Sequence, residues 1–151
     1  MVIVTNFKSE PEKIAERSAI ILSGRVHPGE TPASWILEGL LDFISSEDII
    51  ARQLRDRFVF KIVPMLNPDG VIVGNYRCSL SGFDLNRQYV APNAKQFIEP
   101  FAIKQMLKKT LESRDIYMYC DFHAHSRHQN FFIYGCKNDI KAKKNKEKIF
   151  P

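Results

Sequence analysis

Two residues of the kind that bind metals stand three positions apart in the stretch His27-Pro28-Gly29-Glu30. An apolar run precedes this stretch and an amphipathic segment follows it, so both side chains are expected on a turn between a strand and a helix. Catalytic zinc sites use three protein ligands with nitrogen, oxygen or sulfur donors and leave a further position to water. His27 and Glu30 could supply two of them. The plainer interpretation is that His27 ends a strand and Glu30 favours the positive end of a helix.

A candidate third ligand lies in Asp121-Phe122-His123-Ala124-His125, which follows another apolar run. The carboxyl ends of parallel strands form the edge where open α/β sheets bind ligands, and both runs are expected to end there. Side chains alternate along an extended chain, so His123 and His125 point the same way and the pattern leaves the choice between them open. His128 is expected at the surface. The absence of C-x-x-C and HExxH motifs argues against common structural zinc sites and thermolysin-like proteases.

Strands and helices alternate along the chain, which is typical of the α/β class. Periodicity predicts strands at 18–26, 58–66, 116–122 and 131–135, and helices at 32–45, 48–57 and 95–113. Thr31 and Pro32 predict a helix start, with a capping hydroxyl followed by a proline at the first helical position. Asn67-Pro68-Asp69-Gly70 is a strong turn signal after the second strand.

The composition indicates a globular protein, and the formal net charge of +5 favours an acidic partner. We expect a single domain over residues 1–151, which is long enough to bury a core. Three widely spaced cysteines, Cys78, Cys120 and Cys136, argue for a reducing compartment rather than a disulfide framework. With no signal peptide or membrane-spanning segment recognised, a cytoplasmic location is expected. The lysine-rich segment 141–148 is predicted to be a solvated helix face.

Five motifs occur in a characteristic order within residues 18–137. They are His27-Pro28-Gly29-Glu30, Asn67-Pro68-Asp69-Gly70, Asn75-Tyr76-Arg77-Cys78, Gly82-Phe83-Asp84-Leu85-Asn86-Arg87-Gln88 and Asp121-Phe122-His123-Ala124-His125-Ser126. Together they resemble the zinc metallocarboxypeptidases of the carboxypeptidase A-like family, and most closely the cytosolic branch, which includes tubulin deglutamylases. The resemblance implies a mixed, mainly parallel sheet flanked by helices, the phosphorylase/hydrolase-like fold of that family. It also implies a catalytic domain that is incomplete at its C-terminal end.

The resemblance implies a metal-binding role for three of the matched residues. His27, Glu30 and His123 would hold zinc, because His123 occupies the family's place for the third ligand. His125 would then contact substrate, and it remains the alternative third ligand. Asp84 matches the acid that orients the first histidine, as expected of the carboxylates that support metal-binding imidazoles.

Further matched residues would act on the substrate. Arg77 matches the arginine that faces the developing oxyanion, and a fixed donor of this kind stabilises the transition state. Asn86 and Arg87 match the pair that clamps the terminal carboxylate, which suits the planar fork of arginine. Gly29 departs from the secreted digestive branch, which has an arginine there, and so agrees with the cytosolic branch.

The resulting prediction is a zinc-dependent carboxypeptidase that removes C-terminal amino acids, including glutamates from acidic tails such as those of tubulin. Peptide or protein C-terminal tails would be its partners, rather than nucleic acid or a membrane. The family's general-base glutamate would lie beyond Pro151, so the chain is expected to be weakly active or inactive by itself. The glutamates outside the motifs are expected to be solvated charges: Glu38, Glu47, Glu99, Glu112 and Glu147. The alternatives are a zinc amidohydrolase that deacylates acyl-amino acids and a non-catalytic module that binds acidic tails.

Overall fold

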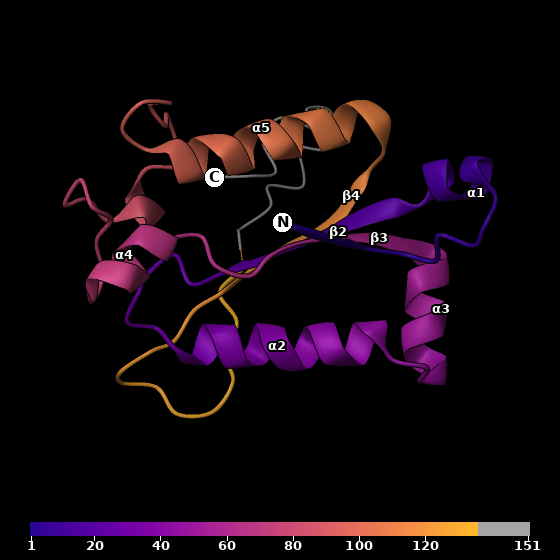
Figure 1. Cartoon of the computed structure of the whole chain (residues 1–151), viewed down its shortest axis with the longest axis horizontal. Helices are drawn as coiled ribbons and strands as arrows, with labels where there is room; N and C mark the ends of the chain where they lie inside the picture. Colours follow the sequence, from indigo (N-terminus) through magenta and orange to yellow (C-terminus); the bar gives the residue numbers. More distant parts are fainter. Residues whose placement is uncertain (136–151) are drawn as a thin grey trace.

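A mixed sheet of four strands lies between two layers of helices in the computed structural model, which describes residues 1–135 (Figure 1). In sheet order its strands are β1 (Val2–Val4), β3 (Phe58–Val63), β2 (Ser18–Gly24) and β4 (Ile116–Phe122). β2 pairs in parallel with both β3 and β4, whereas β1 runs antiparallel to β3. The predicted mixed and mainly parallel sheet is therefore confirmed.

Helices cover both faces of this sheet, with α2 and α5 on opposite sides (Figure 1). The helices are α1 (Pro11–Glu16), α2 (Pro32–Ser45), α3 (Ile49–Arg57), α4 (Pro68–Val73), the 3-10 helix η1 (Leu85–Arg87) and α5 (Ile98–Ser113). The predictions for α2, α3 and β4 are confirmed nearly to the residue. α1 was not predicted, because six residues are too few for a clear helical period.

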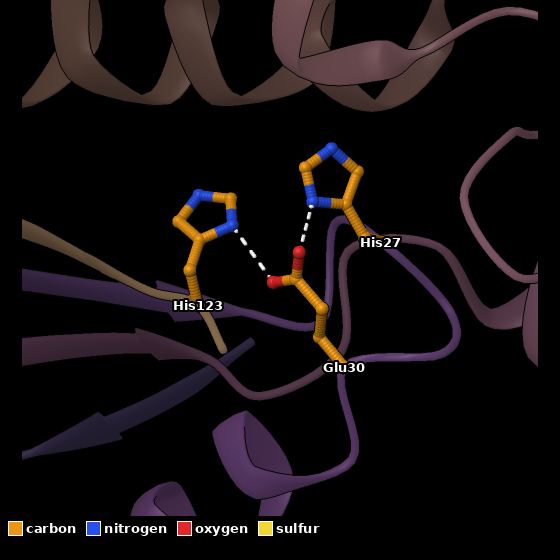
Figure 2. A group of neighbouring side chains, drawn as sticks. All are labelled: His27, Glu30 and His123. Carbon is orange, nitrogen blue, oxygen red and sulfur yellow. Dashed lines mark hydrogen bonds and ion pairs between the residues drawn. The ribbon is translucent and has the colours of Figure 1, made fainter. Parts of the chain in front are cut away.

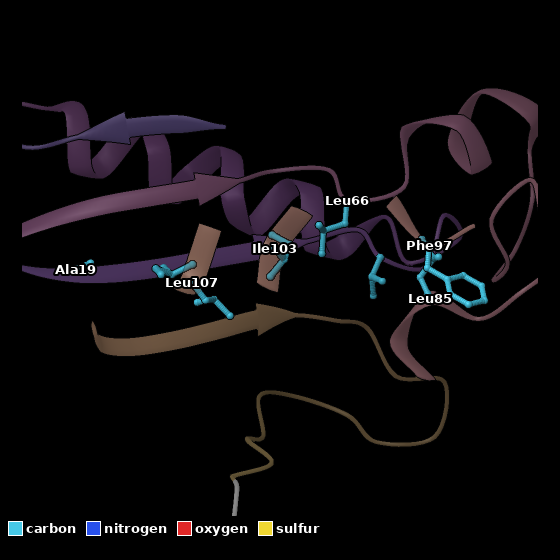
Figure 3. Packing of buried hydrophobic residues seen from close by; sticks show 8 residues of the cluster. Ala19, Leu66, Leu85, Phe97, Ile103 and Leu107 are labelled. Carbon is cyan, nitrogen blue, oxygen red and sulfur yellow. The ribbon is translucent and has the colours of Figure 1, made fainter. Parts of the chain in front are cut away.

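The central strand β2 supplies residues to two separate cores. Ala19 and Ile21 belong to a cluster that contains Ile103 and Leu107 of α5. Its further members include Leu66, Leu85 and Phe97, and Figure 3 shows part of this packing. Ile20 and Leu22 alternate to the other face and join the cluster beneath α2, which contains Leu37, Ile44, Phe60 and Ile62. A strand covered on both faces reads as a continuous apolar run, which is why the sequence pattern identified it.

The start of α2 differs from the prediction in its cap. Thr31 already has helical backbone angles (φ −55°, ψ −33°), and its side chain makes no capping hydrogen bond. The predicted capping hydroxyl is therefore wrong, although Pro32 does occupy the first helical position. At α3, by contrast, the side chain of Asp48 caps the helix and accepts hydrogen bonds from the Ile50 and Ala51 N–H groups.

The Asn67-Pro68-Asp69-Gly70 stretch begins a helix instead of forming a simple turn. Asn67 caps α4 by accepting a hydrogen bond from the Gly70 N–H at 3.0 Å, and Pro68 is the first helical residue. Asparagine followed by proline suits a helix start as well as a turn, so the local pattern did not separate the two. α4 ends at Gly74, whose φ of +86° lies in the left-handed region that glycine adopts easily.

The remaining boundaries also correct the predictions. The strands predicted at 18–26 and 58–66 end at Gly24 and Val63, and the helix predicted at 95–113 begins at Ile98. The predicted strand at 131–135 is wrong, because apolar residues form a strand only when the backbone finds a partner, and no described strand pairs with this segment. Phe131 and Ile133 are instead 92% and 94% exposed.

Three other predictions concern the chain as a whole. The lysine-rich segment 141–148 lies outside the described residues. Within them, Cys78 and Cys120 are free thiols. Over residues 1–135 no helix combines the length and the apolar character needed to cross a membrane.

Candidate metal centre

β2 and β4 end side by side, because Gly24 at the end of β2 pairs with Phe122 at the end of β4. The loop after β2 carries His27 and Glu30, and His123 is the first residue after β4. Figure 2 shows the three side chains pointing toward one another from these two loops. Their nitrogen and oxygen atoms all lie within 4.8 Å of one another. The structure therefore brings together the three residues predicted to bind zinc.

A sharp turn after β2 directs His27 into the molecule. Arg25 has a positive φ of +58°, an uncommon conformation for a residue with a side chain. Its guanidinium stabilises the turn by donating to the Pro28 carbonyl oxygen and the Ser34 hydroxyl, both at 2.7 Å. His27 is consequently only 3% exposed.

The residues that begin α4 pack against this turn and stabilise it. Asn67 is fully buried, and its Nδ2 atom donates to the Val26 carbonyl oxygen at 3.2 Å. Gly70 touches the ring of Pro28 so closely that an added Cβ atom would lie 2.5 Å from Pro28 Cγ. The two motifs at 27–30 and 67–70, which are separate in the sequence, thus form one packed unit.

Glu30 lies between the two histidines and bonds to both. The Nδ1 atom of His27 is 2.7 Å from Glu30 Oε1, and the Nδ1 atom of His123 is 2.9 Å from Glu30 Oε2 (Figure 2). The Ala124 N–H also donates to Oε2 at 2.9 Å. Both Nδ1 atoms and both carboxylate oxygens therefore face the same small volume.

The outer nitrogen of each histidine faces an aspartate. His27 Nε2 lies 3.0 Å from Asp84 Oδ1, and His123 Nε2 lies 2.8 Å from Asp121 Oδ2. Carboxylates commonly accept the second N–H of metal-binding histidines and thereby hold the free nitrogen toward the ion. Asp84 was predicted for this contact, but Asp121 was missed. The available signal was its position two residues before His123, which puts both on one side of an extended chain.

Hydrogen bonding changes the pKa values of the carboxylates. Burial raises the pKa of Glu30, but hydrogen bonds from His123, His27 and the Ala124 N–H outweigh it and hold this pKa well below its ordinary value. The pKa of Asp84 is likewise lowered, because hydrogen bonds from His27 and Arg77 outweigh the effect of burial. Both groups are therefore ionised at neutral pH.

His123 responds to the same carboxylates in the opposite direction. Hydrogen bonds to Asp121 and Glu30 raise the pKa of His123 to about 9 against the effect of burial. A divalent cation between the Nδ1 atoms and Glu30 would replace the protons that link these groups. Two imidazole nitrogens and one carboxylate are the donors of the His₂Glu type of catalytic zinc site, so the residues present fit zinc.

Arg77, predicted to be catalytic, and Asn86, predicted to bind substrate, both contact Asp84. Arg77 Nε donates to Asp84 Oδ2 at 2.8 Å, and the Asn86 N–H donates to Asp84 Oδ1 at 2.9 Å. Arg87 follows in η1 with an exposed side chain, whose Nη1 atom donates a long hydrogen bond of 3.4 Å to the Asn86 carbonyl oxygen. Asp84 thus connects the first metal-facing histidine with the arginine predicted to face the oxyanion.

The structure distinguishes the two candidate histidines. His123 bonds to Glu30, whereas His125 is exposed and its ring lies 4.7 Å from that of His128 and 5.4 Å from that of Phe132. His125 Nδ1 accepts hydrogen bonds from the backbone N–H groups of residues 127 and 128. The assignment of His125 as a substrate contact stays a prediction.

Comparison with known proteins identifies the family of the chain. The chain belongs to the zinc carboxypeptidase family, whose model matches residues 1–150. It is 50% identical over 151 residues to cytosolic carboxypeptidase 2 of Homo sapiens and 48% identical over 155 residues to cytosolic carboxypeptidase 3 of Mus musculus. These alignments cover the whole chain but only 17% and 15% of those two proteins. The resemblance to the cytosolic branch is therefore confirmed.

A solved structure gives the same result for the fold. The metallo-carboxypeptidase from Burkholderia cenocepacia matches 82% of this chain and 32% of its own, with 31% sequence identity and a TM-score of 0.70. The chain therefore spans about a third of that structure and less than a fifth of the two cytosolic relatives.

Proposed function

We propose that the chain carries the zinc-binding part of a carboxypeptidase that removes C-terminal residues from peptide or protein tails. The main support is the convergence of His27 Nδ1, His123 Nδ1 and Glu30 in a member of the zinc carboxypeptidase family. When bound, zinc supplies Lewis-acid polarisation of the scissile carbonyl and activation of water. The two histidines and the glutamate hold the ion, and Asp84 keeps His27 in the orientation that leaves Nδ1 free.

Arg77 stabilises negative charge on the carbonyl oxygen of the substrate. Its contact with Asp84 holds the guanidinium beside the metal centre, while 43% exposure of the side chain leaves it accessible to a peptide. Donors fixed in this way contribute by binding the oxygen more strongly as its charge develops. General-base catalysis is proposed to come from outside residues 1–135, because the metal-binding group found among these residues contains a single glutamate, Glu30, which is itself a proposed ligand.

Asn86 and Arg87 bind the terminal carboxylate, and His125 contacts the substrate at the rim. Guanidinium forms paired hydrogen bonds with a carboxylate, so a free C-terminus would be recognised and an amide would not. The net charge of +5 supports a preference for acidic tails, such as the glutamate-rich tails of tubulin. The naming of the relatives as cytosolic supports a cytoplasmic location.

Metal content tests the proposed ligands independently of turnover. The purified protein is expected to bind about one zinc ion, and His27→Ala, Glu30→Ala and His123→Ala are each expected to lose it. His125→Ala is the matched control and should retain the metal, because this histidine does not contact Glu30. Loss of zinc from His125→Ala with retention in His123→Ala would reverse the choice of third ligand.

Release of free amino acids from short peptides tests the reaction. Peptides ending in Glu-Glu are expected to be cleaved faster than those ending in Leu or Lys, a zinc chelator should stop the release, and C-terminally amidated peptides should resist. The rate should be low, because the general base is proposed to come from outside residues 1–135 and such bases typically raise the rate about 10²- to 10⁴-fold. Vigorous chelator-sensitive turnover would place the base inside this chain, and equal cleavage of amidated peptides would rule out the carboxylate clamp.

A further inference from the structure

A series of hydrogen-bonded side chains runs from the metal centre into the sheet. Asp121 Oδ2 lies 2.8 Å from His123 Nε2, and Asp121 Oδ1 accepts a hydrogen bond from Ser23 Oγ at 2.6 Å. Ser23 Oγ in turn lies 2.9 Å from the hydroxyl of Tyr119. Ser23 is fully buried in β2, so the series joins His123 to the interior of the molecule.

The chemistry of the carboxylate sets the direction of each bond. An ionised carboxylate only accepts hydrogen bonds, so the Ser23 hydroxyl must donate its single proton to Asp121. The oxygen of Ser23 is then left to accept from the Tyr119 hydroxyl. Burial and the nearby charge of Asp121 raise the pKa of Tyr119 to about 12, so the phenol retains its proton at neutral pH. All the donors in the series therefore point toward Asp121.

Strand pairing builds this series into the sheet. Ser23 on β2 is directly paired with Asp121 on β4, so the two side chains are neighbours across the strands. Side chains two positions apart on β4 share a face, which puts Tyr119 and Asp121 on the same side. The corresponding partner of His27, Asp84, lies instead in a loop and also bonds Arg77.

We propose that Asp121, held by Ser23 and Tyr119, is the positioning residue for the third metal ligand. It accepts the N–H of His123 Nε2 and turns Nδ1 toward Glu30. This contact distinguishes His123 from His125, which has no such carboxylate contact among the described interactions. The inference rests on the zinc site proposed above.

Zinc affinity tests this role without relying on catalysis. Dissociation constants are measured by competition with a coloured chelator for the protein, Asp121→Ala, Asp121→Asn and Ser23→Ala. Loss of such a supporting carboxylate typically weakens metal binding about 10- to 100-fold, which is the effect expected for Asp121→Ala. Asp121→Asn should lose less zinc affinity than Asp121→Ala, because its amide oxygen can still accept a hydrogen bond from the N–H of His123 Nε2. Ser23→Ala should lose less than Asp121→Ala but measurably.

Asp42→Ala is the matched control, because Asp42 is exposed on α2 and its removal should leave zinc affinity unchanged. The visible spectrum of bound Co²⁺ reports the coordination geometry and should change in Asp121→Ala but not in Asp42→Ala. Wild-type affinity in a folded Asp121→Ala would overturn the inference. If that variant does not fold, unchanged affinity in both Asp121→Asn and Ser23→Ala would overturn it equally. Retention of zinc by His123→Ala would instead refute the proposed metal site.

Discussion

Each histidine of the metal centre contacts a different aspartate, one of which lies in a loop and the other in a strand. Asp84 lies in the loop before η1, where it also accepts hydrogen bonds from Arg77 and the Asn86 N–H. Asp121 lies within β4 and contacts the buried Ser23. A change at Arg77, the arginine proposed to face the substrate, can therefore reach His27 through one shared carboxylate, whereas His123 contacts an aspartate within the sheet. Substrate binding at Arg77 should therefore affect the position of His27 more than that of His123.

The two arginines should have separable effects on kinetics. Arg77→Ala is expected to lower kcat, by about 10²- to 10³-fold if it behaves as a typical oxyanion donor, with little change in KM. Arg87→Ala should mainly raise KM, because a carboxylate clamp binds the substrate and the transition state alike. Steady-state kinetics of a form that includes the general base, on a peptide ending in Glu-Glu, measure both. Arg77→Lys, which keeps the charge, is the control, and the reverse pattern would exchange the two roles.

The loop that carries Arg77 contacts the metal-binding loop at Gly29. The Gly29 N–H donates to the Tyr76 carbonyl oxygen at 2.8 Å. A Cβ atom added to Gly29 would lie 2.6 Å from the Tyr76 ring and 2.8 Å from that oxygen. Tyr76 thus occupies the space that a side chain at position 29 would need. Glycine is required because the two loops approach so closely.

Replacing this glycine should separate the two loops. Gly29→Ala is expected to destabilise the protein by about 1–3 kcal/mol, as overpacking of a tight contact typically does, and to lower turnover. Gly39→Ala is the matched control, because Gly39 lies inside α2 with open space at its Cβ position. Alanine there should stabilise the helix by up to about 1 kcal/mol. Urea unfolding compares the two variants, and a stabilised Gly29→Ala would contradict the tight contact.

At the scale of the whole molecule, the metal centre joins segments that are far apart in the sequence. His27 and Glu30 follow β2, while His123 follows β4, with α2, α3, β3, α4 and α5 between them. β4 pairs with β2 alone among the described strands, so its outer edge has no neighbour within residues 1–135. A bound ion would therefore cross-link this strand to the centre of the sheet.

Zinc should consequently stabilise the fold as a whole. At a free concentration 100 times the dissociation constant, a ligand that binds only the folded state adds about 2.7 kcal/mol, which corresponds to a rise in Tm of about 10 °C for a chain of this size. Thermal unfolding across a zinc titration measures the shift. His125→Ala should show the same rise and His123→Ala none. A zinc-dependent rise that survives His123→Ala would place the stabilising ion elsewhere.

Local signals in the sequence were sufficient for the main elements and for the first two metal-facing residues. The apolar run of β2, the helical period of α2 and the position of His27 and Glu30 just after a strand all depend on residues near one another in the chain. Periodicity and propensity act over the same short range, so pattern reading succeeded there. The prediction of a strand at 131–135 failed, because an apolar run does not show whether its backbone will find a pairing partner.

Tertiary structure alone decided the contacts that depend on strand register. His123 and His125 are equivalent by alternation, but in the structure it is His123, directly after the pairing of Gly24 with Phe122, that contacts Glu30. The same register puts Asp121 beside Ser23, 98 positions away in the sequence. Local propensity carries no information about partners at such a separation. Contacts of this kind are settled only when the two strands pack between α2 and α5.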